Sequence, residues 1–133
     1  MNKRVMKAAV AAVAVGGFLL GTAGTASAAI DKDGRLESGE FGLYYNSGLG
    51  GCVFDVAADN NFADDYFKGG SCSGNGQTTN DNTASYWNRS VFTQYVFTDW
   101  YKEGIQGSLP SGYSGDASSN FKNKISSTSI IAR

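Results

Sequence analysis

Pairs of carboxylates are the residues with the clearest potential for acid–base chemistry in this chain of 133 residues. Glu37 lies close to Glu40, and Asp64 is followed directly by Asp65. Paired acids of this kind hydrolyse glycosides when a cleft holds them at a fixed separation. The chain has no histidine, which excludes a Ser-His-Asp triad, a Cys-His dyad and a zinc site with a histidine ligand. We therefore expect solvated acids and a binding protein, and no enzyme.

Residues 1–28 have the pattern of a secretory signal peptide. Lys3, Arg4 and Lys7 precede an uncharged, apolar stretch over residues 8–20, and an Ala-Ser-Ala triplet at residues 26–28 supplies a cleavage site. We expect a secreted, extracellular protein whose mature chain has 8 basic and 12 acidic residues, a net charge of 8 − 12 = −4. That charge gives no electrostatic reason to bind nucleic acid or an anionic membrane. We also expect a monomer.

A second acidic run, residues 31–40, matches most of an EF-hand loop in the spacing of its oxygens, glycine and closing glutamate. The first ligand position falls on Ala29, and the preceding helix would belong to the signal peptide. We therefore expect residues 29–38 to form a mobile acidic N-terminus, ahead of one domain over residues 39–133.

Two cysteines, Cys52 and Cys72, remain among the reactive side chains. An even number of cysteines in an exported chain favours one disulfide. It would close a loop over residues 52–72, and a loop of that length contributes about 3 kcal/mol through the unfolded chain. The alternative is a reactive or metal-binding pair of thiols, although the spacing matches no redox or zinc pattern.

Short runs of aromatic and β-branched residues predict strands, and Gly-, Asn- and Ser-rich clusters between them predict turns. Only residues 57–67 have apolar spacing that suits a helical turn or two, and an irregular loop fits them equally well. The pattern indicates an all-β sandwich or barrel. The expected strands cover residues 41–45, 52–56, 86–87, 90–98 and 126–131.

Four aromatic residues would suit a sugar-binding platform. A domain of about 105 residues needs large apolar side chains for its core, so we expect most of the four to be buried there instead. They are Trp87, Trp100, Tyr101 and Tyr113.

One pattern occurs twice: an aromatic residue, four residues, an aliphatic residue, one residue and a glycine. The glycine permits a folded-over hairpin that a Cβ would block, and a later serine can bond back to that hairpin. An Asn-rich run follows each copy and ends in such a serine, Ser85 or Ser127. We expect two similar β units with one shared core. The copies are Tyr44, Leu49 and Gly51 in the first unit and Trp100, Ile105 and Gly107 in the second.

The two units are expected to differ in length. The aromatic residues of the two copies are offset by 100 − 44 = 56, whereas the two serines are offset by 127 − 85 = 42. The first unit is therefore predicted to be longer by 56 − 42 = 14, and the excess falls in the part of the chain that holds both cysteines.

These features resemble the βγ-crystallin fold, whose motifs carry aromatic-x4-aromatic-x-Gly and a downstream serine. Both copies keep the first aromatic and the glycine. Residues 39–47 and 82–89 are also similar to small exported actinobacterial proteins grouped with the Streptomyces metalloproteinase inhibitor, a peptidase-inhibitor family of crystallin-like fold. Gly42 stands where its members often have a cysteine. The resemblance spans residues 37–127 and implies an all-β, βγ-crystallin-like double Greek-key sandwich with one disulfide-stapled loop.

The same resemblance implies candidate Ca²⁺ ligands, because some βγ-crystallin motifs bind the ion through Asn/Asp-Asn/Asp-x-x-Ser/Thr-Ser. Asn80 and Asp81 begin the first run, but Ala84 lacks the hydroxyl of the fifth position. Ser126 supplies that hydroxyl in the second run, which begins with Lys122 instead of an oxygen ligand. We expect a structural role for these residues and no cofactor. The alternative is a weakened Ca²⁺ site assembled from Asn80, Asp81 and Ser126.

The resemblance further implies a peptidase inhibitor whose partner is an extracellular protease. Such inhibitors present a rigid exposed loop, because rigidity lowers the ordering cost of binding. We expect this loop in residues 69–79, which Cys72 tethers, with Gly70, Ser71 and Ser73 around that cysteine. The alternatives are a non-inhibitory binding or structural domain, stabilised by Ca²⁺ or attached to the cell envelope, and a small secreted antimicrobial protein.

Overall fold

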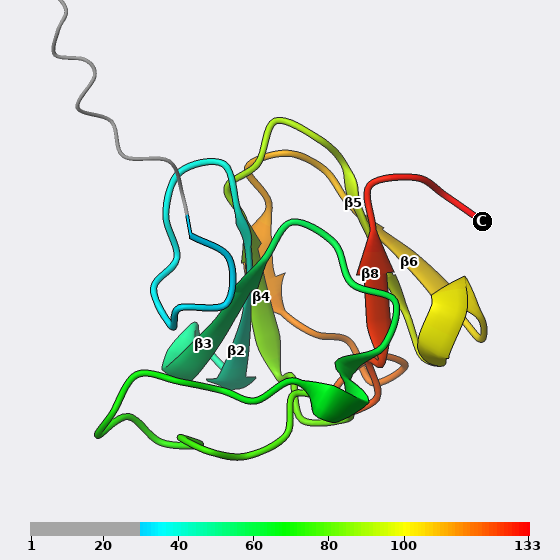
Figure 1. Ribbon diagram of the computed structural model, residues 1–133. Coiled ribbons are helices and arrows are strands. Elements are labelled where there is room, and N and C mark those ends of the chain that lie inside the picture. The colour runs from blue at the N-terminus through cyan, green and yellow to red at the C-terminus, as the bar shows by residue number, and fades with distance from the viewer. Residues whose placement is uncertain (1–29) are drawn as a thin grey trace, which may run out of the picture.

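The computed structural model describes residues 30–133, so the predicted signal peptide lies outside the described residues (Figure 1). Within this range the protein is all-β, as predicted, and its strands form two antiparallel sheets. Two single-turn 3-10 helices, η2 (Phe62–Asp64) and η3 (Trp100–Lys102), lie in the connections. The strands are β2 (Phe41–Asn46), β3 (Gly50–Val56), β4 (Ser85–Asn88), β5 (Gln94–Phe97), β6 (Gln106–Leu109), β7 (Ser114–Asp116) and β8 (Ser127–Ser129).

Strand prediction was wrong at three places in the second half of the chain. β6 and β7 were missed, because both consist mainly of Gly, Ser and other residues with weak strand preference and depend on their partners for pairing. The predicted strand over residues 90–98 begins only at Gln94, which leaves Val91 and Phe92 in a connector.

Each sheet contains backbone from both halves of the chain. The sheet orders are β3-β2-β4-β7 and β6-β5-β8. β7 belongs to the second half but pairs with β4 of the first. In return, Asp59 of the first half bridges Thr128 of β8, with two backbone N–H···O bonds of 3.2 and 2.8 Å. We call residues 41–88 the first unit and residues 94–129 the second. The two units are interlocked by this exchange.

Strand register repeats between the units at an offset of 94 − 41 = 53. Phe41 pairs with Val56 in the β2–β3 hairpin, and Gln94 pairs with Leu109 in the β5–β6 hairpin. The two serines that follow are offset by 127 − 85 = 42. The first unit is therefore longer by 53 − 42 = 11, not by 14, and the extra length lies between β3 and β4.

The predicted offset of 56 between the hairpin patterns is corrected by this register. Tyr44 pairs with Ser85, and its counterpart, which pairs with Ser127, is the buried Phe97 and not Trp100. The prediction aligned the second copy on Trp100, a tryptophan in the exposed turn beyond the strand. The same shift separates the two predicted glycines: Gly51, with φ of 75°, corresponds to Gly104, with φ of 76°, and Gly107 lies within β6.

The core between the sheets is filled mainly by phenylalanine and aliphatic side chains. Phe41 and Leu43 alternate on the inner face of β2 and are fully buried, as the two-residue period of a strand requires. Phe54 of β3 packs edge-on against Phe62 of η2, with ring centroids 5.3 Å apart. The expectation that the other large aromatics lie mainly in the core is wrong: Trp87, Trp100, Tyr101 and Tyr113 are 36%, 45%, 64% and 41% exposed.

The N-terminal segment from Ile30 onward is docked, which corrects the prediction of a mobile tail. The backbone N–H groups of Asp33 and Gly34 donate to the carboxylate of Asp55, a fully buried residue of β3, over 3.1 and 2.7 Å. The N–H of Lys32 donates to the Asp55 carbonyl over 2.7 Å. A buried carboxylate requires such donors, so the segment supplies what this strand position needs.

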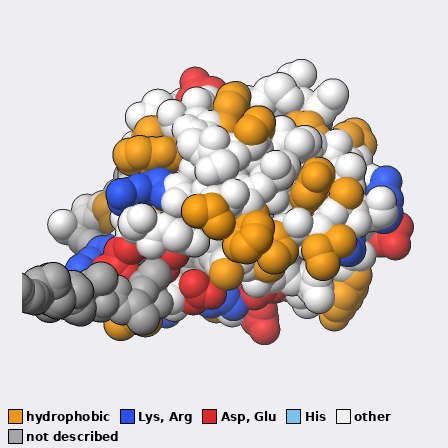
Figure 2. Space-filling model, turned by 90° about the horizontal axis from the view of Figure 1, so that it is seen from above, with side chains coloured by type: hydrophobic (Ala, Val, Ile, Leu, Met, Phe, Trp, Pro, Cys, Tyr) orange, Lys and Arg blue, Asp and Glu red, His pale blue; other side chains and the backbone are white. Residues whose placement is uncertain are grey.

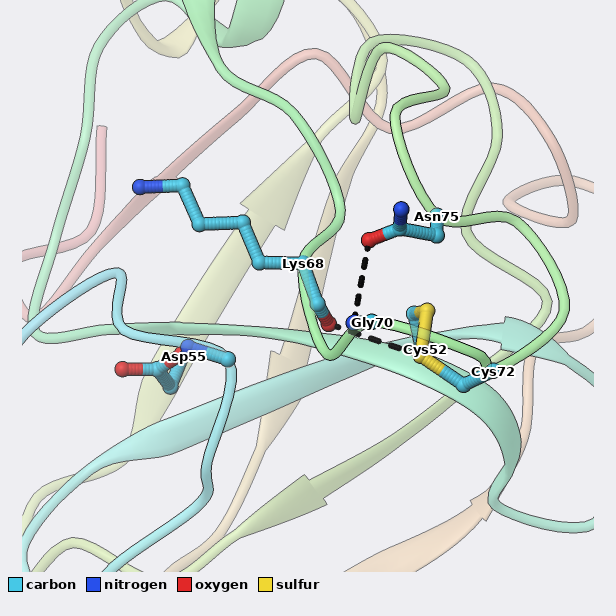
Figure 3. Close-up of a disulfide and its surroundings, with 7 residues drawn as sticks. Cys52, Asp55, Lys68, Gly70, Cys72 and Asn75 are labelled. Atoms are coloured by element: carbon cyan, nitrogen blue, oxygen red, sulfur yellow. Dashed lines mark hydrogen bonds between the residues drawn. A yellow bond between two sulfur atoms is a disulfide. The ribbon is translucent and has the colours of Figure 1, made fainter.

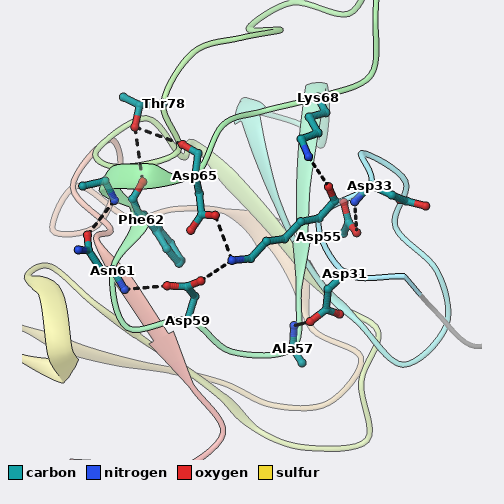
Figure 4. Close-up of polar contacts among 12 residues, drawn as sticks. Asp31, Asp33, Asp55, Ala57, Asp59, Asn61, Phe62, Asp65, Lys68 and Thr78 are labelled. Atoms are coloured by element: carbon teal, nitrogen blue, oxygen red, sulfur yellow. Dashed lines mark hydrogen bonds and ion pairs between the residues drawn. The ribbon is translucent and has the colours of Figure 1, made fainter.

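Lys32 also anchors the segment, because its ammonium group binds the carboxylates of Asp59 and Asp65, which Figure 4 labels. Its Nζ lies 2.6 Å from Asp59 Oδ2 and 3.0 Å from Asp65 Oδ1. Burial by itself lowers the pKa of Lys32, but its bonds to the two carboxylates raise that pKa above its ordinary value. Burial raises the pKa of Asp65, and Lys32 offsets only part of this rise.

Candidate functional site

The predicted disulfide between Cys52 and Cys72 is present (Figure 3). It joins the stapled segment, our name for residues 69–79, to β3. The N–H of Cys52 donates to the carbonyl of Ser73 over 2.8 Å and ties the segment to the strand a second time. Cys72 itself is half-buried. The exposed residues beside it are Gly70, Ser71 and Ser73.

Glycines allow the stapled segment to lie flat against the core. A Cβ on Gly69 would stand 2.5 Å from the Cys72 sulfur, and one on Gly74 would overlap the ring of Tyr45. Both glycines have positive φ, which residues with a Cβ rarely adopt. Tyr45 in turn packs edge-on against Phe67, with centroids 5.5 Å apart. The segment is thereby seated on the hydrophobic core.

Local hydrogen bonds fix the turn of the segment. The N–H of Gly70 donates to the Asn75 side-chain oxygen over 3.2 Å, as Figure 3 shows, and the N–H of Asn75 donates to the Cys72 carbonyl over 3.3 Å. The N–H of Gln77 donates to the carbonyl of Gly74 over 2.9 Å. The residues beside Cys72 are exposed to solvent, and these bonds hold the backbone around them in one conformation.

The two serines of the repeat occupy equivalent places on the hairpins. The hydroxyl of Ser85 donates to the Asn46 carbonyl over 2.6 Å and accepts from the Leu49 N–H over 3.0 Å. The Ser127 hydroxyl donates to the carbonyl of Asp99 over 2.7 Å and accepts from the N–H of Lys102 over 3.2 Å. Each hydroxyl thus bridges the two sides of a hairpin turn. The two serines therefore have a structural role, which is to hold the hairpin turns closed.

Asn80, Asp81 and Ser126 come together from the two units in one pocket of 370 Å³. The hydroxyl of Ser126 donates to Asp81 Oδ1 over 3.1 Å. Asp99 and Glu103 line the same pocket, which makes it acidic. The structure therefore collects the three residues that the two imperfect runs supply separately.

Only part of this donor set is free to meet a cation. The Trp100 indole N–H donates to Asn80 Oδ1 over 2.7 Å and occupies that oxygen. Across residues 30–133 no group of three or more Cys, Asp and Glu side chains is close enough to hold a metal ion. The equivalent pocket of the other unit, of 300 Å³, is lined by Lys122 and Asn123 and brings an ammonium group instead of a carboxylate. The two pockets therefore differ in charge.

The two acids of each predicted pair differ in their surroundings. Glu40 is buried, with 1% exposure, and its Oε2 accepts from the N–H of Glu37 over 2.7 Å. Burial raises the pKa of Glu40, and the nearby acids raise it further. Asp65 faces Lys32, whereas Asp64 is exposed. Neither pair places two carboxylates across a cleft, and Glu40 and Asp65 instead serve internal contacts.

One exposed element was missed by sequence reasoning. Val91 and Phe92 project from the connector between β4 and β5, and buried Asn88 and Ser90 stand at its base. The sequence feature that could have indicated this connector is a pair of large apolar residues directly after an Asn-Arg-Ser triplet. Because Val and Phe prefer strands, the sequence predicts a strand there instead.

Comparison with known proteins adds no relative: no protein-family model, no curated protein and no solved structure matches the chain. Residues 30–133 include no helix of the length and apolar character that crossing a membrane requires. A disulfide is compatible with an extracellular location, where such bonds form and persist.

Proposed function

We propose that the protein is an extracellular peptidase inhibitor that presents the stapled segment to the cleft of a peptidase. One observation carries the proposal: the residues around Cys72 are exposed, while the disulfide and the backbone bonds hold their conformation. A loop that is ordered before binding loses little conformational entropy in the complex. The resemblance of residues 39–47 and 82–89 to the metalloproteinase-inhibitor family favours the same function.

We also infer that the fold is a βγ-crystallin-like double Greek key. The exchange of β7 into the first sheet and of Asp59 toward β8 supports this inference, because each unit then places its third segment in the sheet of the other unit. The serine bonds at both hairpins support it as well. Such a frame leaves its loops exposed for binding.

Residual activity of a peptidase panel that includes thermolysin and subtilisin, measured with excess mature protein, tests the inhibitor proposal. We expect inhibition of at least one peptidase and a weaker effect of the Ser71→Asp variant, which places a charge in the stapled segment. Ser119→Asp is the matched control, because it places the same charge on an exposed serine of a different loop. Full activity of every peptidase with wild-type protein overturns the proposal.

A second candidate is a Ca²⁺-stabilised binding domain, favoured by the convergence of Asp81 and Ser126 beside Asp99. Carboxylate and hydroxyl oxygens suit this hard cation. We expect millimolar Ca²⁺ to raise the melting temperature, and Asp81→Ala to abolish the rise. Asn123→Ala, at the equivalent position of the other unit, is the control that keeps it. A melting temperature independent of Ca²⁺ rejects this candidate.

A further inference from the structure

The connector between the two units, residues 89–93, exposes two adjacent apolar side chains. Val91 is 82% exposed and Phe92 is 53% exposed. Among the described residues no other large apolar side chain is as exposed as Val91. In Figure 1 the connector is the yellow-green arch at the top, whereas the stapled segment is the green loop at the bottom, so the two loops lie at opposite ends of the molecule.

Asn88 holds the base of this connector. Its side-chain amide is fully buried and donates to the carbonyls of Phe92 and Leu109 over 2.8 and 2.9 Å. Its oxygen accepts from the N–H and the hydroxyl of Ser90 over 3.0 and 2.7 Å. All four hydrogen-bonding positions of the amide are therefore used, and they span the connector from one side to the other.

Ser90 and Phe92 are fixed on either side of Val91. The hydroxyl of Ser111 donates to the Ser90 carbonyl over 2.5 Å, and the Phe92 N–H donates to the Ser90 hydroxyl over 3.3 Å. The N–H and carbonyl of Val91 take part in none of the hydrogen bonds found among the described residues. The flanks are thus rigid, while the backbone at the tip is free to pair with an extended partner segment.

The connector itself has one charged side chain, Arg89. Arg89 turns toward Trp87, with its guanidinium 5.2 Å from the ring centroid. Figure 2 looks onto this end of the molecule and shows apolar side chains among backbone and uncharged side chains, with the charged side chains mostly at the rim. A pre-ordered pair of apolar anchors with free backbone between held flanks is the arrangement that inserts into an apolar pocket.

We propose that the Val91–Phe92 tip is a second docking loop, which enters the side-chain pocket of an extracellular endopeptidase of apolar specificity. The proposal rests on the inhibitor function and adds a site that is chemically distinct from the polar stapled segment. Val91 and Phe92 supply the apolar contacts, and the free Val91 backbone pairs with the edge of the peptidase cleft. Asn88 and Ser90 are positioning residues that hold the loop in its bound form.

Inhibition constants for thermolysin and chymotrypsin, which take apolar side chains, test the proposal, with trypsin as the peptidase of basic specificity. We expect the double variant Val91→Ser/Phe92→Ser to raise the inhibition constant for an apolar-specific peptidase about 30-fold or more. Phe92→Leu keeps an apolar anchor and should stay within about threefold of wild type. Ile105→Ser, at an exposed isoleucine in the β5–β6 hairpin, is the control and should have no effect.

Two results distinguish failure of this proposal from failure of the inhibitor function. If wild-type protein inhibits no peptidase, the inhibitor function is overturned and the docking loop falls with it. If wild-type protein inhibits and only Ser71→Asp weakens the inhibition, the inhibitor function stands and the docking loop is overturned. Inhibition of trypsin alone also overturns the docking loop, because the tip offers no basic anchor to that pocket.

Discussion

Removing the hydroxyl of Ser85 or Ser127 should destabilise the domain by about 2 kcal/mol in each case. Each hydroxyl makes one bond as donor, of 2.6 or 2.7 Å, and one as acceptor, of 3.0 or 3.2 Å. A hydrogen bond contributes about 1 kcal/mol net, and a buried group left without a partner adds to the loss. Both serines have 0% exposure, so water does not reach the vacated position without rearrangement of the hairpin.

Urea unfolding followed by far-UV circular dichroism measures this loss for Ser85→Ala, Ser127→Ala and the double variant. Ser129→Ala is the matched control, because the Ser129 hydroxyl lies on the same strand β8 and accepts only one bond, from the exposed Ile131 N–H over 3.0 Å. We expect the control to lose less than about 0.5 kcal/mol. The double variant should lose about 4 kcal/mol, since the serines bind hairpins of separate sheets and act independently.

The result that refutes this reasoning is a loss of under about 0.5 kcal/mol for both single variants, equal to that of the control. Such a result means that the β2–β3 and β5–β6 hairpins hold their turns without the bridge. A loss at Ser85 alone would show that the equal geometry of the two units does not carry equal energy. Either outcome is measured directly against Ser129→Ala in the same experiment.

Three further predictions concern other contacts. The variant Cys52→Ala/Cys72→Ala should lose about 3 kcal/mol in urea unfolding, because its unfolded chain is no longer cross-linked; a loss of under about 1 kcal/mol contradicts this. Burial raises the pKa of Glu40, so its protonation stabilises the fold: this stability is complete below the ordinary pKa of 4.5 and is lost as pH rises through the raised value. The melting temperature should therefore rise on mild acidification, and it should rise less in Glu40→Gln. Profiles of melting temperature against pH that are equal for the wild type and this variant contradict the prediction. Lys32→Met should cost about 2 kcal/mol, because it leaves buried Asp65 without its cation; thermal unfolding with Arg35→Met as control checks this.

Local residue preference was sufficient for the parts of the fold that depend on short segments. Residues 41–45 and 52–56 were placed in strands because they combine aromatic and β-branched residues, and β2 and β3 include them. The disulfide was predicted from the even number of cysteines in a chain with a predicted export signal, and it is present. Both features depend on short segments or on composition, and neither depends on which segments meet in space.

Features that depend on tertiary contact could not be read from local preference. The N-terminal segment is docked because its N–H groups donate to the buried Asp55 carboxylate. The sequence around residue 33 does not indicate that a distant buried carboxylate will bind it. The spacing of the repeat was misread because Trp100 has an aliphatic residue and a glycine at the expected distances, whereas Phe97 has Lys102 at the aliphatic position. Only the pairing of Phe97 with Ser127 identifies the true counterpart. The connector was predicted as a strand because Val and Phe prefer strands. That local preference takes no account of the Asn88 amide, which binds the backbone of the connector.

The repeat also indicates where binding functions should lie. Residues of β2, β3, β5 and β6 obey one register, and Ser85 and Ser127 close both hairpins alike, so these positions serve the frame that the units share. Three elements lie outside the paired strands that the two units share: the docked N-terminal segment, the stapled segment between β3 and β4, and the connector 89–93. The first is bound to Asp59 and Asp65 through Lys32, whereas each of the other two exposes side chains between hydrogen-bonded flanks. Because a shared frame accounts for neither loop, the stapled segment and the connector are where binding variants will have their largest effect with the least loss of stability.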